Sequence, residues 1–263
     1  MTNDGWNAGL TYEEFMGRWS RPLAREFVIW LEVPSQSNWL DVGTGTGALA
    51  EAICDLGEPE SVKACDPAAP FVDAARNRLT ESRVEFTVAG EGDLPGIMDG
   101  YDAVVSNLVL NFFDDAQAAI EEQAGLLSAD GVVAACVWDY ADQMQFLRVF
   151  WDAAGDLDSR ALEMDEATRF PICSPWALEQ LFASAGLNRV RTTALTLPTV
   201  FGSFEDYWAP FLGGTGPAPS FVANLSAVDR KALADSLRGR LPIADDGRIE
   251  LHARAWAVAG QAV

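Results

Sequence analysis

The stretch LDVGTGTGALA, residues 40–50, joins a short apolar run to a helical pattern through a turn in which every second residue is glycine. Gly43, Gly45 and Gly47 allow the backbone to turn tightly and to approach a ligand, because glycine has no Cβ. A strand, a glycine-rich turn and a helix in this order begin the α/β folds that bind ligands at the edge of a parallel sheet. The stretch therefore predicts an α/β fold with a ligand site at this turn.

The rest of the chain alternates short Val- and Ala-rich runs with amphipathic patterns. Strands are predicted over 37–43, 61–66, 83–90, 101–110, 132–138, 189–197 and 248–260, and helices over 46–57, 67–79, 114–131, 173–187 and 227–241. Apolar runs without polar alternation are typical of strands that are covered on both faces, as in parallel sheets. We therefore expect a doubly wound, mostly parallel seven-stranded sheet (Rossmann-like) with helical or loop lid insertions.

The domain boundaries follow from two irregular segments that leave the sheet where such folds bind ligands. We expect four parts: an N-terminal helical cover at 1–35, a ligand-binding core at 36–139, a lid insertion at 140–173, and the rest of the sheet at 174–263 with a second lid insertion at about 201–242.

The charge of the chain limits its partners. With 39 acidic and 18 basic residues the formal net charge is -21, which disfavours nucleic acid and anionic membranes. The N-terminus lacks the pattern of a signal peptide, and no apolar run reaches the roughly 18 residues of a membrane helix. The four cysteines are scattered, so we expect no metal site. These features predict a cytoplasmic protein with a small neutral or cationic substrate; oligomeric state stays open.

Asp41 is the residue that discriminates between ligands. The turn also satisfies the dinucleotide pattern G-x-G-x-x-A, with Gly43, Gly45 and Ala48. A pyrophosphate at this turn would be repelled by Asp41, whereas a cationic ligand would be attracted. S-adenosylmethionine (SAM) carries an ammonium and a sulfonium, and backbone N–H groups of the turn can bind its carboxylate.

These motifs, LDVGTGTG together with the N-terminal segment MGRWSR, resemble those of class I SAM-dependent methyltransferases that act on small molecules. The resemblance implies SAM as cofactor and S-adenosylhomocysteine (SAH) as product. It places the turn residues Asp41, Gly43, Thr44, Gly45 and Gly47 at the cofactor.

The resemblance also assigns further cofactor contacts. Asp66 at the end of the second strand corresponds to the acid that binds both ribose hydroxyls, a role that a carboxylate can fill. The other assignments are Pro67 and Phe71 on adenine, Gly90, Glu91 and Gly92 at the adenine edge, Asn107 and Leu108 near the methionine part, and Arg18 and Trp19 as a cover. Arg18 is the expected partner of the methionine carboxylate. Gly90 stands where the family usually carries an acid.

No catalytic residue is predicted. Asn111 replaces the histidine that many relatives carry after the fourth strand, and an amide cannot act as a base. The lone His252 reads as a structural strand residue, and Tyr12, Glu13, Asp139 and Tyr140 are weak candidates for a base. Because a sulfonium is an activated leaving group, alignment alone supplies much of the rate. Predicted substrate contacts are Tyr12, Asn111, Trp151, Trp208 and Phe211.

Two alternatives remain open. An NAD(P)-dependent oxidoreductase would use Gly43, Gly45 and Asp66, but it leaves Asp41 unexplained, and the chain shows no Tyr-x-x-x-Lys pair. A non-methylating SAM-fold enzyme, such as a cyclase, or a ligand-binding protein would fit the absence of a histidine after the fourth strand. The sequence does not identify the methyl acceptor or the accepting atom.

Overall fold

The protein is built on one seven-stranded sheet, seen in a computed structural model that describes residues 17–213 and 216–262. The strand order is β3-β2-β1-β4-β5-β7-β6. The strands are β1 (Asn38–Val42), β2 (Ser61–Asp66), β3 (Val84–Val88), β4 (Tyr101–Asn107), β5 (Leu127–Trp138), β6 (Asn188–Phe201) and β7 (Ile249–Gln261). β1 to β5 are parallel, and β7 runs antiparallel to both β5 and β6. The predicted fold class is confirmed.

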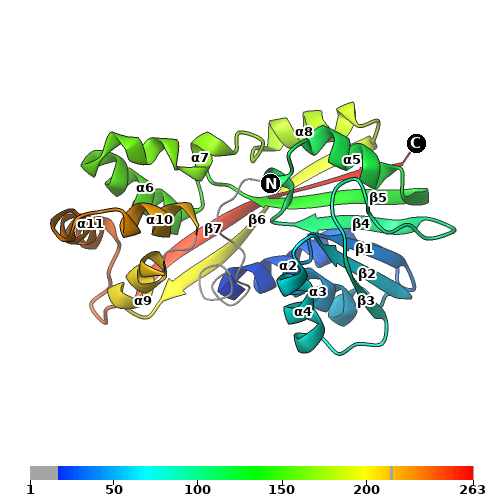
Figure 1. Cartoon of the computed structure of the whole chain (residues 1–263), viewed down its shortest axis with the longest axis horizontal. Coiled ribbons are helices and arrows are strands. Elements are labelled where there is room, and N and C mark those ends of the chain that lie inside the picture. The colour runs from blue at the N-terminus through cyan, green and yellow to red at the C-terminus, as the bar shows by residue number, and fades with distance from the viewer. Residues whose placement is uncertain (1–16, 214–215, 263) are drawn as a thin grey trace.

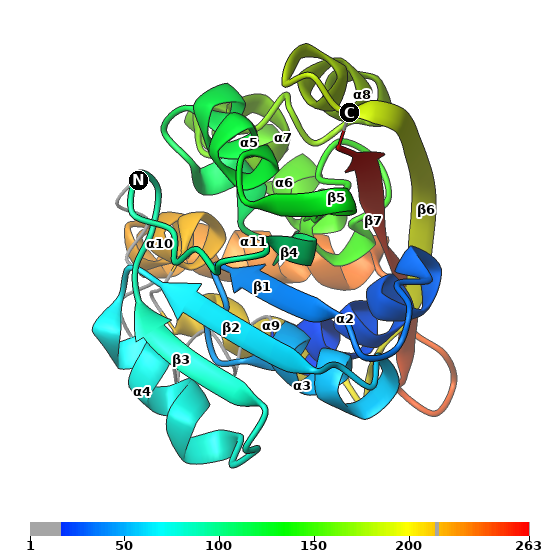
Figure 2. The same ribbon diagram turned by 90° about the vertical axis from the view of Figure 1, so that its right-hand side faces the viewer.

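Helices cover both faces of the sheet (Figures 1 and 2). One layer holds α2 (Arg18–Leu31), α3 (Ala48–Leu56) and α4 (Ala69–Arg78); the other holds α5 (Ala116–Ala124) and α8 (Pro175–Ser184). The two layers bury a continuous apolar core that includes the Val- and Ala-rich faces of β4, β5 and β7. Burial on both faces explains why these strands lack polar alternation.

The 3-10 helix η2 (Leu110–Phe112) follows β4, and the helices of the two insertions gather at one end of the molecule (Figure 1). After β5 come α6 (Gln145–Leu157), the 3-10 helix η3 (Ser159–Glu163) and α7 (Glu166–Arg169); between β6 and β7 come α9 (Phe204–Trp208), η4 (Ala209–Leu212), α10 (Pro217–Ala223) and α11 (Ala227–Arg240). α6 packs against α10 and α11, so the two insertions form one body. We call these helices the lid. They lie at the carboxyl end of β5.

The start of β5 differs from the prediction. A helix was expected over 114–131, but α5 ends at Ala124, and Leu127 already pairs with Tyr101 of β4. Asp130 has a φ of 64°, and the pairing shifts register between Tyr101 and Ala103. The Asp-Gly pair at 130–131 is therefore a bulge inside the strand.

β6 also runs farther than predicted, to Phe201, through Pro198. β6 is the edge strand of the sheet, so one of its sides has no neighbouring strand. A proline is tolerated in such a strand because an N–H on that side would have no strand to bind. β6 and β7 therefore extend together beyond the sheet and carry the lid.

None of the helices in residues 17–213 and 216–262 is long and apolar enough to span a membrane. In the same residues, no group of three or more His, Cys, Asp or Glu side chains is arranged to hold a metal.

Candidate functional site

The candidate site lies where the order of the strands reverses, between β1 and β4. The chain proceeds from β1 outward to β2 and β3, and then returns to the other side of β1 with β4. The connections after β1 and β4 consequently diverge at the carboxyl edge of the sheet, which is where open α/β folds bind ligands.

The three glycines of the turn differ in what a side chain at each position would meet. All three have positive φ, of 72° at Gly43, 54° at Gly45 and 81° at Gly47. A Cβ on Gly43 would lie 2.7 Å from a methyl carbon of Val109, and one on Gly47 would lie 3.3 Å from the Cβ of Ala75. A Cβ on Gly45 would meet no atom of the described residues within 4 Å. Only Gly45 therefore offers its backbone for close approach.

Asp41 is the buried acid of the site. Its side chain is 0% exposed, and its Oδ2 accepts a hydrogen bond of 2.7 Å from the Thr44 hydroxyl. Its Oδ1 has no hydrogen-bond partner within the described part of the chain. Burial raises the pKa of Asp41 to about 7; the charge of Asp66 adds to this rise, and the Thr44 hydroxyl and the backbone N–H of Ala50 at the start of α3 oppose it. A cation beside Oδ1 would stabilise the ionised form.

Asp66, at the tip of β2, is held against the turn. Its Oδ2 accepts from the backbone N–H of Gly45 at 3.0 Å, and its Oδ1 accepts from the N–H of Ala68 at 2.9 Å. Burial raises the pKa of Asp66, and these two bonds oppose the rise. Since each carboxylate oxygen can accept a second bond, Asp66 retains two acceptor positions for a pair of hydroxyls.

The predicted adenine edge is formed by the loop after β3. A Cβ on Gly90 would lie 3.1 Å from the Cβ of Pro67, so the ring of Pro67 occupies the place of a side chain there. The loop is fixed from α5, where the Glu122 carboxylate accepts from the N–H groups of Gly92 at 2.8 Å and Leu94 at 3.1 Å. The sequence did not point to Glu122, because the contact joins segments about 30 residues apart. Phe71 and Glu91, which were also predicted to contact adenine, are both partly buried.

The segment after β4 is both strained and polar. Leu108 has a φ of 64°, a left-handed conformation that is unusual outside glycine. Its backbone N–H donates to the carbonyl oxygen of Cys136 at 2.7 Å. Asn107 Oδ1 and both amide atoms of Asn111 are buried and have no partner in residues 17–213 or 216–262. Strain of this kind persists where the surrounding structure imposes it, commonly at functional sites. The structure thus brings predicted residues of β1 and β4 to one edge.

The structure does not bring Arg18 to the turn. Its guanidinium donates to Asp206 of α9 at 3.0 Å and to the carbonyl of Val200 at 2.8 Å, and it stacks on Phe201. Trp19 is 5% exposed and packs against Phe201 and Phe146. Both residues therefore join the start of α2 to the lid, a role that differs from the predicted carboxylate contact.

The aromatic residues of the lid form a core of their own. Phe150 stacks on Phe211 at 4.4 Å, and Trp151 packs edge-on against Phe221. Trp151 and Phe211 are at most 1% exposed, so they support the lid from within, whereas Trp208 is only partly buried. Of these three residues, Trp208 alone keeps part of its surface exposed.

The lid also contains a buried acid that the sequence did not single out. Glu166 accepts a hydrogen bond from Trp151 Nε1 at 2.5 Å, and burial raises its pKa to about 7.

The weak candidates for a base are occupied or lie elsewhere. Asp139 forms an ion pair with Arg254 at 2.6 Å, which joins the end of β5 to β7. His252 is exposed on β7. Tyr12 and Glu13, with the predicted substrate role of Tyr12, lie outside the described residues. Asn111 lies in the short 3-10 helix Leu110–Phe112 that follows β4.

Comparison with known proteins is consistent with this geometry. A family model described as a methyltransferase domain matches residues 40–135, which hold the glycine turn, Asp66 and the β4 tip. The chain is 33% identical over 104 residues to a malonyl-[acyl-carrier protein] O-methyltransferase of Acetivibrio thermocellus, covering 40% of this chain and 36% of that protein. It is 30% identical over 131 residues to an uncharacterized methyltransferase of Mycobacterium bovis, covering 49% and 58%. The matches thus span about a third to three fifths of these relatives.

A solved structure extends the likeness to the whole fold. A phosphoethanolamine N-methyltransferase of Haemonchus contortus, in complex with phosphomonomethylethanolamine and SAH, superposes with a TM-score of 0.61. The superposition covers 99% of this chain and 57% of that one at 13% identity, so it shows a shared fold. The match to a methyltransferase domain supports SAM as the cofactor.

Proposed function

We propose that this protein transfers a methyl group from SAM to a small-molecule acceptor. The observation that carries the proposal is the unpartnered Oδ1 of Asp41, a buried acceptor on a carboxylate with a pKa of about 7, beside a glycine turn that is open at Gly45. An ammonium or sulfonium ligand supplies the missing positive charge. Asp66 supplies acceptors for two ribose hydroxyls.

The same residues fit a dinucleotide poorly. A pyrophosphate bound at the start of α3 would face the buried carboxyl of Asp41. A carboxylate beside two phosphates would add repulsion, which water screens little at a buried position. This charge pattern favours SAM over NAD(P).

Catalysis is assigned to positioning. SAM supplies an activated methyl group, so the protein needs to hold the acceptor in line and to exclude water. Asn111 offers an amide that can donate to and accept from a polar acceptor, and it does not remove a proton. The lid would close this space over the acceptor.

The acceptor is expected to be small and neutral or cationic. The relative from Acetivibrio is named for a protein-bound substrate, malonyl-[acyl-carrier protein]. A carrier that is itself acidic would be repelled by a chain of net charge -21. The charge of this chain therefore favours a free small molecule.

The proposal is tested by titrating the protein with SAM and SAH, followed by a screen of small acceptors for transfer of labelled methyl. Binding of SAH with transfer to at least one acceptor supports the whole proposal. Binding of SAH without transfer to any acceptor from a broad panel contradicts the methyltransferase activity and favours a non-methylating SAM protein.

A further inference from the structure

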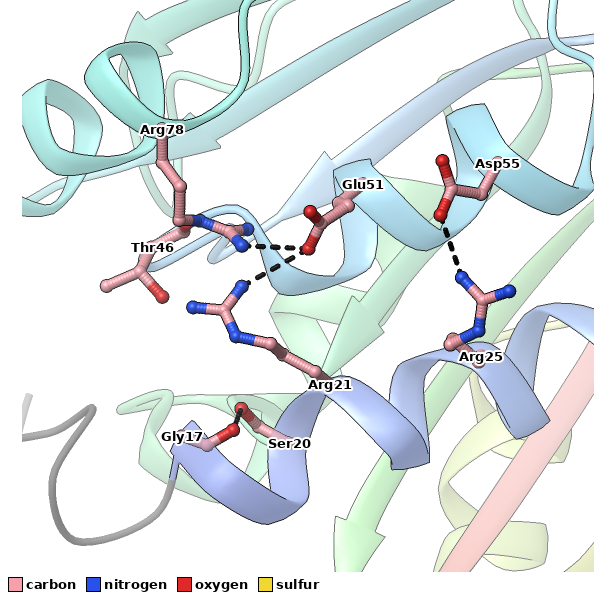
Figure 3. Close-up of polar contacts among 8 residues, drawn as sticks. All are labelled: Gly17, Ser20, Arg21, Arg25, Thr46, Glu51, Asp55 and Arg78. Atoms are coloured by element: carbon pink, nitrogen blue, oxygen red, sulfur yellow. Dashed lines mark hydrogen bonds and ion pairs between the residues drawn. The ribbon is translucent and has the colours of Figure 1, made fainter.

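Two ion pairs join α2 to α3 on the side of the glycine turn (Figure 3). Arg21 Nη1 lies 3.2 Å from Glu51 Oε2, and Arg25 Nη1 lies 2.8 Å from Asp55 Oδ2. Residues four apart share one face of a helix, so the two pairs are successive rungs between the same helices. The two pairs differ in the further partners of their acidic residues.

Glu51 receives a second cation. Arg78, the last residue of α4, donates from Nη1 to the same Oε2 of Glu51 at 2.8 Å and from Nε to the carbonyl of Thr46 at 2.9 Å. Thr46 belongs to the glycine turn. Among the residues that the structure describes, the Asp55 side chain in contrast forms a hydrogen bond and ion pair with Arg25 alone.

Several hydrogen bonds already shape the first part of the turn: the Gly47 N–H donates to the Thr44 carbonyl at 2.8 Å, the Thr44 hydroxyl donates to Asp41, and the Gly45 N–H donates to Asp66. The glycines nevertheless have an unusually wide choice of backbone conformations, and Gly47, the N-cap of α3, provides no side-chain cap. The planar fork of an arginine can bind two groups at once in a set geometry. Arg78 does so here, because it holds the Thr46 carbonyl and Glu51 together.

We infer that Glu51 is a positioning residue: by binding Arg21 and Arg78 together, it secures the Thr46 end of the glycine turn and ties α2 to it. Glu51 need not touch the cofactor for this role. The consequence for ligand affinity rests on the proposed function, whereas the consequence for the turn does not.

The test compares Glu51→Gln with the matched control Asp55→Asn. Both substitutions remove one carboxylate charge from α3 and one partner of an α2 arginine. Hydrogen exchange of the amides in residues 45–51 should become faster by about threefold to tenfold in Glu51→Gln, because a coupled set of ion pairs is lost. It should be unchanged in Asp55→Asn. The affinity for SAH, measured by calorimetry, should fall by a similar factor in Glu51→Gln only.

Hydrogen exchange and SAH affinity together distinguish failure of this inference from failure of the proposed function. Equal exchange of residues 45–51 in the wild type and in Glu51→Gln overturns the inference. A loss of affinity that is the same in Glu51→Gln and Asp55→Asn also overturns it, because the effect would then come from general charge. If the wild type binds no SAH, the proposed function fails, while the exchange comparison still decides the role of Glu51.

Discussion

The backbone N–H of Gly45 donates a hydrogen bond of 3.0 Å to Oδ2 of Asp66, so the turn after β1 is tied to the tip of β2. Of the three glycines in the turn, Gly45 is the one at which a Cβ would meet no atom of the described residues within 4 Å. The residue proposed to bind ribose and the backbone proposed to approach the ligand are therefore one connected unit. Substitution of Asp66 and substitution of Gly45 test the two parts of this unit separately.

Asp66→Ala is expected to weaken SAH binding by at least about a hundredfold. The variant loses two hydrogen bonds to a charged group, each contributing about 1.5–3 kcal/mol. Asp66→Asn should bind with intermediate affinity, because the amide keeps one acceptor. Calorimetry measures both, and Asp73→Ala, which removes an exposed acid of α4, serves as the control. Wild-type affinity in Asp66→Ala would exclude the ribose assignment.

Gly45→Ala should abolish measurable SAH binding while the fold is retained. A Cβ there enters the open space, and the left-handed backbone adds a strain of about 1–2 kcal/mol. Gly186→Ala is the matched control: Gly186 also has a positive φ and open surroundings, but it follows α8 on the opposite layer. Equal melting temperatures with binding lost only in Gly45→Ala support the site. Normal binding in Gly45→Ala would place the ligand elsewhere.

The affinity for SAH should depend on pH through Asp41. The ionised carboxylate binds a cation, and the pKa of Asp41 in the free protein is about 7. Affinity should therefore rise as pH increases from 5.5 to 7.5, with a limiting slope of about tenfold per pH unit below pH 7. Asp41→Asn should bind more weakly and without this slope. A parallel pH profile in the wild type and in Asp41→Asn would contradict the assignment.

The stability of the free protein should show the opposite trend from the same group. The folded-state pKa of Asp41, about 7, lies above its unfolded value, so the folded state retains a proton that the unfolded state has lost in the intervening window. The free energy of unfolding therefore falls as pH rises through that window. Asp41→Asn should lessen this fall, which urea denaturation at several pH values measures.

How much of this site could be predicted varies with the kind of contact. Asp41 and Asp66 were predictable because each is set by its place at the end of a parallel strand, and the strand, turn and helix pattern is local. Glu122 on the 90–94 loop and Arg78 on Thr46 were not, since these contacts join helices to loops about 30 residues away. The start of β5 was misassigned, because the Asp-Gly pair at 130–131 is typical of a turn and here forms a bulge.

The same limit applies to the lid. Aromatics between strands indicated an apolar cover, but the pattern does not distinguish a packed core from a binding surface. Packing buries Trp151 and Phe211 and turns Arg18 toward Asp206, a residue 188 positions away. Trp208, which is partly buried, remains the lid residue suited to a test of substrate contact.

Trp208→Ala should impair methyl transfer more than cofactor binding. Misplacement of the acceptor should lower kcat/KM by about ten- to a hundredfold, while the affinity for SAH stays within about twofold of wild type, because Trp208 lies in the lid. Trp176→Ala, at a tryptophan of α8 that is 71% exposed, is the control and should leave both unchanged. A Trp208→Ala enzyme with full activity would remove this residue from the substrate site.

The most direct measurement for the whole account is calorimetric titration of the wild-type protein with SAH, SAM and NADH under the same buffer conditions. The charge pattern of Asp41 beside the open Gly45 predicts that SAH and SAM bind and that NADH does not. Binding of NADH with no heat from SAH or SAM would contradict the assignment and identify the turn as a dinucleotide site.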